Sequence, residues 1–436
     1  MENLHFIKYR KDESIVFSRE NFDFAIIKDN NIKKIDKALE KVGFGSKALS
    51  ERPVVKNKSL TYMSTNKCNL KCKYCYADEG TYGLQHTVSM TYEKYLEIYM
   101  KYAEKNDVSK ILFFGGEPLL NFEEIKKFVD KVSSINPDLN YGIITNGTIM
   151  NKKIEEFLLD YSFDVTFSLD GIRELQNENR IYKDGRGTFD TIINNIRRIT
   201  KYNKLRVAIE STISSIYIIN YKRGYMKKII QLFEDLNVNA FSFLLVITDD
   251  SELKITHDME YSVRLIYREI VKDFFERILQ EDSGLVDITV LSLVSKIITK
   301  KKSKDCSSGR AVLVDNKGDT YPCQMFYNSE KYNLGNVLID DIEKINIRGL
   351  EVHNLNRFHV NECKNCIAKN ICYSWCRGLN YLKNGEILST IYEKCLQQRI
   401  LLEETLVGLA KIKEHKDNAK IFVENYNKII KKWENG

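Results

Sequence analysis

The chain has 436 residues, of which 43% are hydrophobic and 29% charged, a balance typical of folded globular proteins and not of disordered or fibrous ones. Its 67 basic side chains are nearly matched by 60 acidic ones, so the net charge of +7 does not require a nucleic-acid partner. No stretch approaches ~18 consecutive apolar residues, and residues 1–11 lack the apolar core of a signal peptide. We therefore expect a cytoplasmic protein with no membrane partner, whose ten cysteines serve metal binding or catalysis and not disulfides.

The first part of the chain predicts a small module. Apolar runs at residues 14–17 and 22–27 predict two strands, and the spacing of apolar residues over 32–42 predicts a helix. A turn-rich stretch then predicts a linker before a main domain that begins near residue 59. We therefore expect a β-β-α module over residues 1–55.

From residue 59 onward, predicted strands and helices alternate. Strands are expected at residues 60–64, 111–114, 141–145, 164–168, 205–211 and 240–246. Helices with a 3.6-residue period are expected at residues 92–103, 122–132, 192–199 and 226–236, with more helix over 250–300 and 396–432. This alternation predicts an α/β domain with a parallel sheet and right-handed crossovers. Periodicity alone leaves two architectures open, a doubly wound sheet and a partial barrel.

Three cysteines follow the first of these strands. Cys68, Cys72 and Cys75 have the spacing C-x3-C-x2-C. Three thiolates on one loop can hold three corners of a cubane iron–sulfur cluster and leave the fourth iron open for chemistry. Structural zinc is the alternative, but zinc normally takes four protein ligands, and the next histidine, His86, is eleven residues beyond Cys75.

This loop resembles that of the radical S-adenosylmethionine (SAM) enzymes, with Tyr74 in the aromatic place of their C-x3-C-x-aromatic-C motif. The segment Gly115-Gly116-Glu117-Pro118 ends the second strand and resembles the segment with which that family holds the methionine part of SAM. The resemblance implies that the glycines let the backbone approach SAM and that the Glu117 carboxylate binds its ammonium group. Without the cysteine loop, the same four residues would be an ordinary turn.

Polar residues near the ends of later strands complete the SAM site that the resemblance implies. Ser168 ends the fourth strand, where the family contacts the ribose of SAM. Arg180 is expected to bind the SAM carboxylate, because a guanidinium binds carboxylates in a bidentate manner. Asn146, after the third strand, is expected to contact the cofactor. A surface ion pair for Arg180 and a plain turn at Asn146 are the alternatives.

The other seven cysteines lie in the C-terminal part of the chain. They are Cys306, Cys323, Cys363, Cys366, Cys372, Cys376 and Cys395. Four of them have the spacing C-x2-C-x5-C-x3-C, which alone would also fit a zinc knuckle. Their full order resembles the seven-cysteine pattern of SPASM domains, which carry two auxiliary four-iron clusters in radical SAM enzymes that modify peptides and proteins.

The resemblance implies how these cysteines divide between two clusters. The first auxiliary cluster would be held by Cys306, Cys323 and Cys376, and the second by Cys363, Cys366, Cys372 and Cys395. Three protein ligands leave one iron of the first cluster open. A substrate cysteine would bind there, because such iron prefers thiolate ligands and promotes their deprotonation.

One residue departs from the pattern of the sulfatase maturases. These relatives carry an aspartate, their proton acceptor, directly after the second auxiliary cysteine, whereas this chain has Gln324, whose amide is no base. Residues 76–83 resemble instead the thioether-forming maturases of cysteine-rich peptides. The resemblance therefore implies thioether crosslinks, from cysteine sulfur to carbon, made through a 5'-deoxyadenosyl radical. The alternatives are carbon–carbon crosslinking or oxidative decarboxylation of a peptide, anaerobic sulfatase maturation, and a non-enzymatic electron-transfer scaffold.

The same resemblance implies the organisation of the chain. A partial (β/α)6 barrel would form the radical SAM core over residues 59–300, followed by a SPASM domain over 301–400 and a helical segment over 401–436. Residues 1–55 resemble part of the element with which such maturases bind a leader peptide, and a structural cap is the alternative. The implied cofactors are SAM and three 4Fe-4S clusters, one SAM-binding and two auxiliary. The implied partners are a cysteine-rich precursor peptide with a leader and a flavodoxin or ferredoxin as electron donor, with no nucleic acid.

Overall fold

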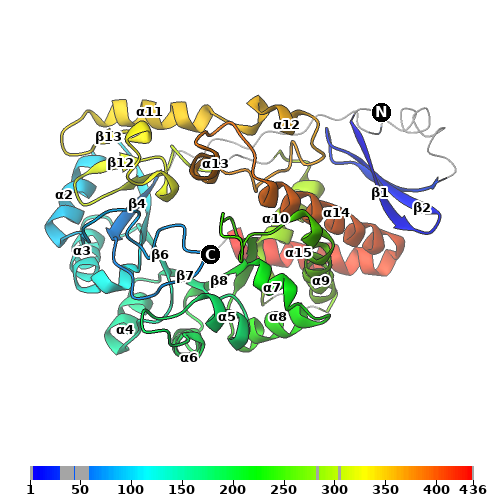
Figure 1. The fold of residues 1–436 in the computed structure, drawn as a ribbon, viewed down its shortest axis with the longest axis horizontal. Helices are drawn as coiled ribbons and strands as arrows, with labels where there is room; N and C mark the ends of the chain where they lie inside the picture. The colour runs from blue at the N-terminus through cyan, green and yellow to red at the C-terminus, as the bar shows by residue number, and fades with distance from the viewer. Residues whose placement is uncertain (1–2, 30–43, 45–57, 281–283, 303–305, 435–436) are drawn as a thin grey trace.

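The central element of the fold is one large sheet surrounded by helices (Figure 1). The computed structural model describes residues 3–29, 44, 58–280, 284–302 and 306–434. In these ranges the sheet has ten strands, in the order β10-β9-β8-β7-β6-β5-β4-β11-β12-β13. A separate sheet of three strands lies near the N-terminus.

Six parallel strands form the main part of the large sheet. They are β4 (Lys58–Thr65), β5 (Val108–Gly115), β6 (Asn140–Thr145), β7 (Asp164–Ser168), β8 (Arg206–Ile213) and β9 (Ala240–Leu245). All six were predicted from the sequence, and they pair in chain order. A doubly wound sheet reverses its strand order at a switch point, whereas this sheet continues in one direction, as a barrel does. Because β10 and β13 are its two edges, the barrel is partial, as predicted.

Helices connect these strands on the outside of the sheet (Figure 1). They are α2 (Tyr92–Ala103), α3 (Phe122–Ile135), α4 (Lys152–Asp160), α5 (Arg173–Asn179), α6 (Phe189–Thr200), α7 (Ser215–Ile219) and α8 (Tyr225–Asp235). Their amphipathic spacing explains the arrangement: α6, for example, buries Ile192, Ile196 and Ile199 on one face. The predicted helices α2, α3, α6 and α8 are confirmed, whereas α4, α5 and α7 were not predicted.

The cysteine-rich segment extends the sheet of the barrel. Strand β11 (Val312–Val314) pairs in parallel with β4, and β12 (Asp319–Tyr321) and β13 (Gly335–Asn336) follow in antiparallel order. Sequence patterns did not predict this pairing. It joins the segment that follows Cys306 to the first strand of the barrel, so the C-terminal cysteines are attached directly to the core.

The remaining helices lie in the C-terminal half. They are α9 (Glu260–Leu279), α10 (Ile288–Thr299), α11 (Ile342–Asn354), α12 (Asn361–Lys364), α13 (Arg377–Asn384), α14 (Tyr392–Glu414) and α15 (Lys416–Glu434), with strand β10 (Val286–Asp287) pairing with β9. Short 3₁₀ turns are η2 (Pro118–Asn121), η3 (His257–Met259), η4 (Gln324–Phe326), η5 (Glu330–Tyr332) and η6 (Arg357–His359). Helix predictions over 250–300 and 396–432 are confirmed. None of the helices in the described ranges combines the length and hydrophobicity that crossing a membrane requires.

The N-terminal sheet has three antiparallel strands where the sequence predicted two. They are β1 (Leu4–Arg10), β2 (Glu13–Ser18) and β3 (Phe24–Lys28). Strand β1 was missed because charged residues interrupt its apolar ones, so that it has no continuous apolar run. Such alternation is the pattern of a half-buried strand. The sheet lies beside α14, and the Tyr9 hydroxyl donates a hydrogen bond of 2.9 Å to Glu414 (Figure 1). The helix predicted over residues 32–42 lies outside the described residues.

Candidate active site

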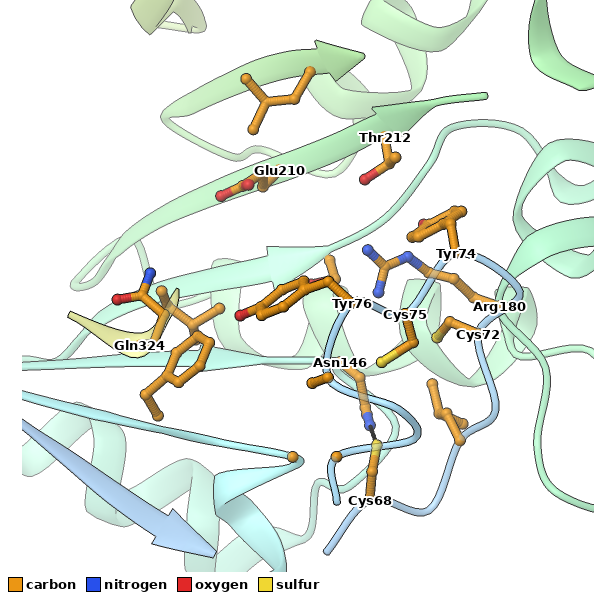
Figure 2. A pocket seen from close by; sticks show the side chains of 18 of the residues that line it. Cys68, Cys72, Tyr74, Cys75, Tyr76, Asn146, Arg180, Glu210, Thr212 and Gln324 are labelled. Carbon is orange, nitrogen blue, oxygen red and sulfur yellow. Dashed lines mark hydrogen bonds between the residues drawn. The ribbon is translucent and has the colours of Figure 1, made fainter. Parts of the chain in front are cut away.

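A cavity of about 300 Å³ lies at the carboxyl ends of the parallel strands. This end of a barrel is where loops gather functional side chains. Its wall combines the cysteine loop after β4, the ends of β5 to β9 and three C-terminal segments, as Figure 2 shows in part. Predicted site residues in this wall are Cys68, Cys72, Tyr74, Cys75, Gly115, Gly116, Asn146, Ser168 and Arg180.

The three cysteines of the first loop all face this cavity (Figure 2). The loop is tied to the segment after α5, because the Lys71 and Lys73 amides donate hydrogen bonds of 2.9 Å to the carbonyls of Ile181 and Asn179. Burial raises the pKa of the Cys68 thiol to about 11 and that of Cys72 to about 12, and the neighbouring thiols add to both rises. Thiols in this setting become thiolates when a metal compensates the charge, so the donor set fits a metal cluster.

Gly115 and Gly116 are required by the packing of the chain against itself. A Cβ atom at position 115 would lie 2.3 Å from the carbonyl oxygen of Thr65, and one at position 116 would lie 2.3 Å from that of Lys67. The Gly116 amide also donates a hydrogen bond of 2.8 Å to the Thr65 carbonyl. The two glycines therefore hold the chain that leads into Cys68, in addition to lining the cavity.

Glu117 and Pro118 lie outside the cavity wall. The Glu117 carboxylate is fully buried and accepts hydrogen bonds from the Leu119 amide (3.0 Å), the Thr145 hydroxyl (2.8 Å) and the Asn146 amide (2.7 Å). Burial outweighs these bonds and raises its pKa to about 7. The geometry thus gives Glu117 an internal role, to position Asn146, and its contact with the SAM ammonium stays a prediction. Pro118 begins η2 and is buried.

Asn146 and Ser168 extend the polar wall from β6 and β7. The Asn146 side-chain amide donates a hydrogen bond of 2.9 Å to Asn69 and lies 3.8 Å from the Cys68 sulfur (Figure 2). Ser168 is half-buried and ends β7 in the cavity wall. Both residues therefore lie where a cofactor held by the cysteine loop would extend.

Arg180 and Tyr74 share a buried partner that the sequence analysis did not single out. The Asp170 carboxylate, fully buried, accepts a hydrogen bond of 3.1 Å from Arg180 Nε and another from the Tyr74 hydroxyl. The Arg180 guanidinium lies over the Tyr74 ring, 5.3 Å from its centroid. Its charge lowers the pKa of Cys72, opposing the effect of burial. Arg180 is therefore a fixed cation beside the cysteine loop.

The seven C-terminal cysteines form two groups in space. Burial raises the pKa of the Cys323 thiol to about 12, and the nearby Cys376 and Cys306 thiols raise it further. The other four, Cys363, Cys366, Cys372 and Cys395, line a second cavity of about 30 Å³. These are the same two groups that the family resemblance implies. The ten cysteines all lie in the described ranges, and no disulfide bond joins any two of them.

Each C-terminal group also has a buried arginine that the sequence analysis missed. Arg377 is fully buried and lies 3.3 Å, through Nη1, from the Cys306 sulfur, and its Nε donates to the Leu355 carbonyl at 2.6 Å. Arg357 lines the second cavity, donates to the Lys369 carbonyl at 2.7 Å and lowers the pKa of Cys372. Arg377 directly follows Cys376, and this position could have identified it from the sequence. Nothing in the sequence around Arg357 indicated that it lies beside a cysteine group.

Three further polar residues of the main cavity come from distant elements. Glu210 and Thr212 face it from β8, where every second side chain points inward (Figure 2). Lys394, on α14, lines both this cavity and the one formed by the second cysteine group. Glu210 is a charged residue within a predicted strand that is largely apolar, and this pattern could have identified it as a site residue. Gln324, beside Cys323, also lines the main cavity, so its chemistry bears on the reaction.

Single metal ions are a separate question from clusters. In the part of the chain that the structure describes, no three His, Cys, Asp or Glu side chains are close enough to hold one metal ion. An iron–sulfur cluster places several irons between its thiolates and spaces them more widely than one ion does. This finding therefore concerns mononuclear sites only.

A partial parallel barrel with a three-cysteine loop at its carboxyl end defines a class of iron–sulfur enzyme. Residues 62–233, which contain that loop and the first strands of the barrel, match the family model of the Radical SAM superfamily. The chain therefore carries a Radical SAM domain, and this family implies a 4Fe-4S cluster and SAM.

Relatives of known activity cover most of the chain. It is 26% identical over 374 residues to a cysteine-type anaerobic sulfatase-maturating enzyme of Clostridium novyi, covering 79% of this chain and 96% of that one. It is also 26% identical over 379 residues to the radical SAM cyclopropyl synthase TigE of Paramaledivibacter caminithermalis, covering 80% of this chain and 74% of that one.

Solved structures share the fold. The tagged anSMEcpe with bound AdoMet has a TM-score of 0.67 at 21% identity, covering 85% of this chain and 99% of that one. Streptococcus suis SuiB bound to its precursor peptide SuiA has a TM-score of 0.56 at 14% identity, covering 91% and 99%. At these identities the likeness concerns the fold alone, and it confirms the predicted α/β architecture.

Proposed function

We propose that the protein modifies a ribosomally made precursor peptide by forming thioether bonds from cysteine sulfur to carbon. One observation carries this proposal: the same cavity is lined by the first cysteine loop and by Gln324 and Met325, which directly follow Cys323. A substrate in this cavity would therefore lie between the site of SAM and the group formed by Cys306, Cys323 and Cys376. Formation of a bond from sulfur to carbon requires the SAM site and this cysteine group to lie close together.

The residues present fit three iron–sulfur clusters. Cys68, Cys72 and Cys75 would hold the SAM-binding cluster, and the two C-terminal groups would hold the auxiliary ones. Around SAM, the chain would supply Tyr74, Gly115, Gly116, Asn146, Ser168 and Arg180. When bound, the first cluster supplies the electron that splits SAM into methionine and a 5'-deoxyadenosyl radical. The protein binds the peptide, orients its reacting carbon and excludes water.

The proposed partners follow from the relatives and from the fold. Solved neighbours carry peptides, Kp18Cys in anSMEcpe and SuiA in SuiB, which supports a peptide substrate here. The sheet of β1 to β3 would bind a leader peptide by accepting it as an added strand. A flavodoxin or ferredoxin would donate electrons. We place the enzyme in the cytoplasm, because its ten free cysteines suit a reducing compartment.

Formylglycine formation in a sulfatase is the second candidate, favoured by the sulfatase-maturating relatives. The local chemistry at position 324 opposes it. Gln324 lies in the cavity wall, where its amide cannot take a proton from the substrate. Position 324 is thus the observation that weighs against the second candidate.

The test is a reaction with defined peptides. The protein is reconstituted without oxygen and incubated with SAM, a reductant and either a precursor peptide encoded beside its gene or a cysteine-type sulfatase peptide. A thioether product has lost two hydrogens and one free thiol, as thiol alkylation and mass spectrometry will show. A carbon–carbon bond leaves the thiol, decarboxylation also removes carbon dioxide, and formylglycine reacts with hydrazines. Any of these last three products would exclude the thioether proposal.

A further inference from the structure

The main cavity contains one carboxylate whose position no structural contact explains. Among the described residues that line this cavity, Glu210 is the one with a carboxylate side chain. Figure 2 shows its position in the wall. The residue is half-buried, and no hydrogen bond or salt bridge joins its carboxylate to another described residue. Removing a carboxylate from water without a hydrogen bond or an ion pair destabilises a folded protein. Groups kept at such a cost are typical of functional sites.

Three side chains that titrate or carry charge face Glu210 from the surrounding elements. They are Lys394 of α14, Arg180 after α5 and Tyr76 of the cysteine loop. Burial raises the pKa of Glu210, while the charges of Lys394 and Arg180 lower it and favour the ionised form. An ionised carboxylate with a raised pKa is a better proton acceptor than one on the surface.

The proposed reaction requires a proton acceptor. When a C–H and an S–H are converted into a C–S bond, two hydrogens leave. One leaves the carbon as a hydrogen atom and joins the 5'-deoxyadenosyl radical. The other leaves the sulfur as a proton, and the auxiliary cluster that Cys306, Cys323 and Cys376 would hold would accept the remaining electron. Gln324, at the position where sulfatase maturases carry their acid–base residue, cannot take this proton.

The geometry points to Glu210 as the group that accepts the proton of the substrate cysteine thiol. Its carboxylate faces the same cavity as Gln324, from β8 instead of η4. The inference rests on the proposed function and deepens it, because it names a thiol-bearing peptide as the group that Glu210 contacts. Lys394 and Arg180 are positioning residues that keep the carboxylate ionised before the thiol arrives.

The test compares the wild-type protein with Glu210→Gln, Glu210→Asp and the control Glu351→Gln, which changes an exposed carboxylate on α11 outside the cavity. SAM cleavage is measured first without peptide, and the control Glu351→Gln is expected to match the wild-type protein. Product formation from the precursor peptide is then measured from pH 6.5 to pH 9. At neutral pH it should fall by about 100-fold or more in Glu210→Gln, the range typical of a lost general base.

The pH profile distinguishes a base from a structural residue. In Glu210→Gln, product formation should recover as the pH approaches about 8.5, where a free thiol ionises without help. The wild-type profile should be flatter, and Glu210→Asp should restore part of the rate at neutral pH.

Each other outcome rejects the inference in a recognisable way. Loss of SAM cleavage in Glu210→Gln without peptide would make Glu210 a SAM contact. Equal product formation in Glu210→Gln and wild type at every pH would remove it from the reaction. Inactivity of both variants at every pH would indicate a structural role. If the wild-type protein cleaves SAM but forms no thioether with the peptide, the proposed function itself is wrong, and this inference with it.

Discussion

The two cysteine-bearing regions of the molecule bring thiols together by different means. Cys68, Cys72 and Cys75 lie on one loop after β4, so short-range chain geometry already places them close together. The C-terminal cysteines come from separate segments that run from Cys306, before β11, to Cys395, within α14, and the two groups are interleaved in sequence. Joining such distant segments costs loop-closure entropy, which packing of the surrounding elements must offset. The first region is therefore local in origin, and the second depends on tertiary structure.

Despite this difference, each cysteine group has an arginine close by. Arg180 lowers the pKa of Cys72, Arg377 lies 3.3 Å from the Cys306 sulfur, and Arg357 lowers the pKa of Cys372. A guanidinium stays charged under all ordinary conditions and donates in a fixed geometry. The common requirement is thus a permanent positive charge beside thiols that must become thiolates, and not a common backbone motif.

Cys72→Ala gives the largest expected effect, because it removes one ligand from the local region. Formation of methionine and 5'-deoxyadenosine should fall to background, since the SAM-binding cluster is lost. Iron should fall from about twelve to about eight per chain, one four-iron cluster fewer. Iron analysis and chromatography of the SAM products test this, and continued SAM cleavage would remove Cys72 from the site.

Cys306→Ala makes the matching change in the distant region. Abortive SAM cleavage should continue, because the first loop is intact, while peptide product should fall to background. The measurement is product mass beside the yield of 5'-deoxyadenosine, with Cys72→Ala as the opposite control. A normal product yield would show that this group has no catalytic part.

Glu117 provides a pH test of the local region. Its pKa is raised to about 7 in the folded chain, above the ordinary value of 4.5, so its burial is least costly when it is protonated. Compared with Glu117→Gln, the wild-type protein should keep its full free energy of unfolding below pH 4.5. It should lose on the order of 3 kcal/mol of that free energy as the pH rises from 4.5 through 7. Urea unfolding between pH 4.5 and 8 measures the difference. Parallel curves for the two proteins would mean that the carboxylate is ionised throughout.

A pair of glycine substitutions gives the smallest expected effect and separates the two regions. In Gly116→Ala the new Cβ lies 2.3 Å from the Lys67 carbonyl oxygen, and in Gly378→Ala it lies 2.3 Å from the Cβ of Met325. Each should lower the free energy of unfolding by about 2 kcal/mol through overpacking. Gly116→Ala should weaken SAM cleavage, whereas Gly378→Ala should mainly lower product formation.

The control for this pair is Gly142→Ala in β6, where the nearest atom to the new Cβ belongs to the flexible Leu112 side chain, at 3.1 Å. Its effect on unfolding and on both activities should be smaller than that of either test variant. If the two test variants affect SAM cleavage equally, the two regions are coupled more tightly than their separate positions indicate.

Sequence patterns predicted much of the fold and the cysteine groups. The six parallel strands alternate with amphipathic helices, and this periodicity follows from which side chains must be buried. The cysteine loop was visible because its three ligands are close in sequence. Strand β1 was missed because charged residues interrupt it, and the pairing of β11 with β4 was missed because it joins residues far apart in the chain.

The site was predicted less completely than the fold. Tyr74, Asn146, Ser168 and Arg180 were expected to face the SAM site, and all four line the cavity. Glu117 was expected there too, yet it is fully buried and bonded to its own chain. Burial cannot be read from a motif, because it depends on which elements pack over a residue. For the same reason the sequence did not identify Glu210, Lys394, Arg357 or Arg377.

The sequence by itself determined the class of chemistry and the order of the strands, because ligand spacing and hydrophobic periodicity are local properties of the chain. Tertiary structure alone decided that one cavity is shared by the cysteine loop, Gln324 and Glu210. It also decided that a buried arginine lies beside each C-terminal cysteine group. These facts depend on contacts between distant segments, whose free energy comes from packing the whole core and not from any single motif.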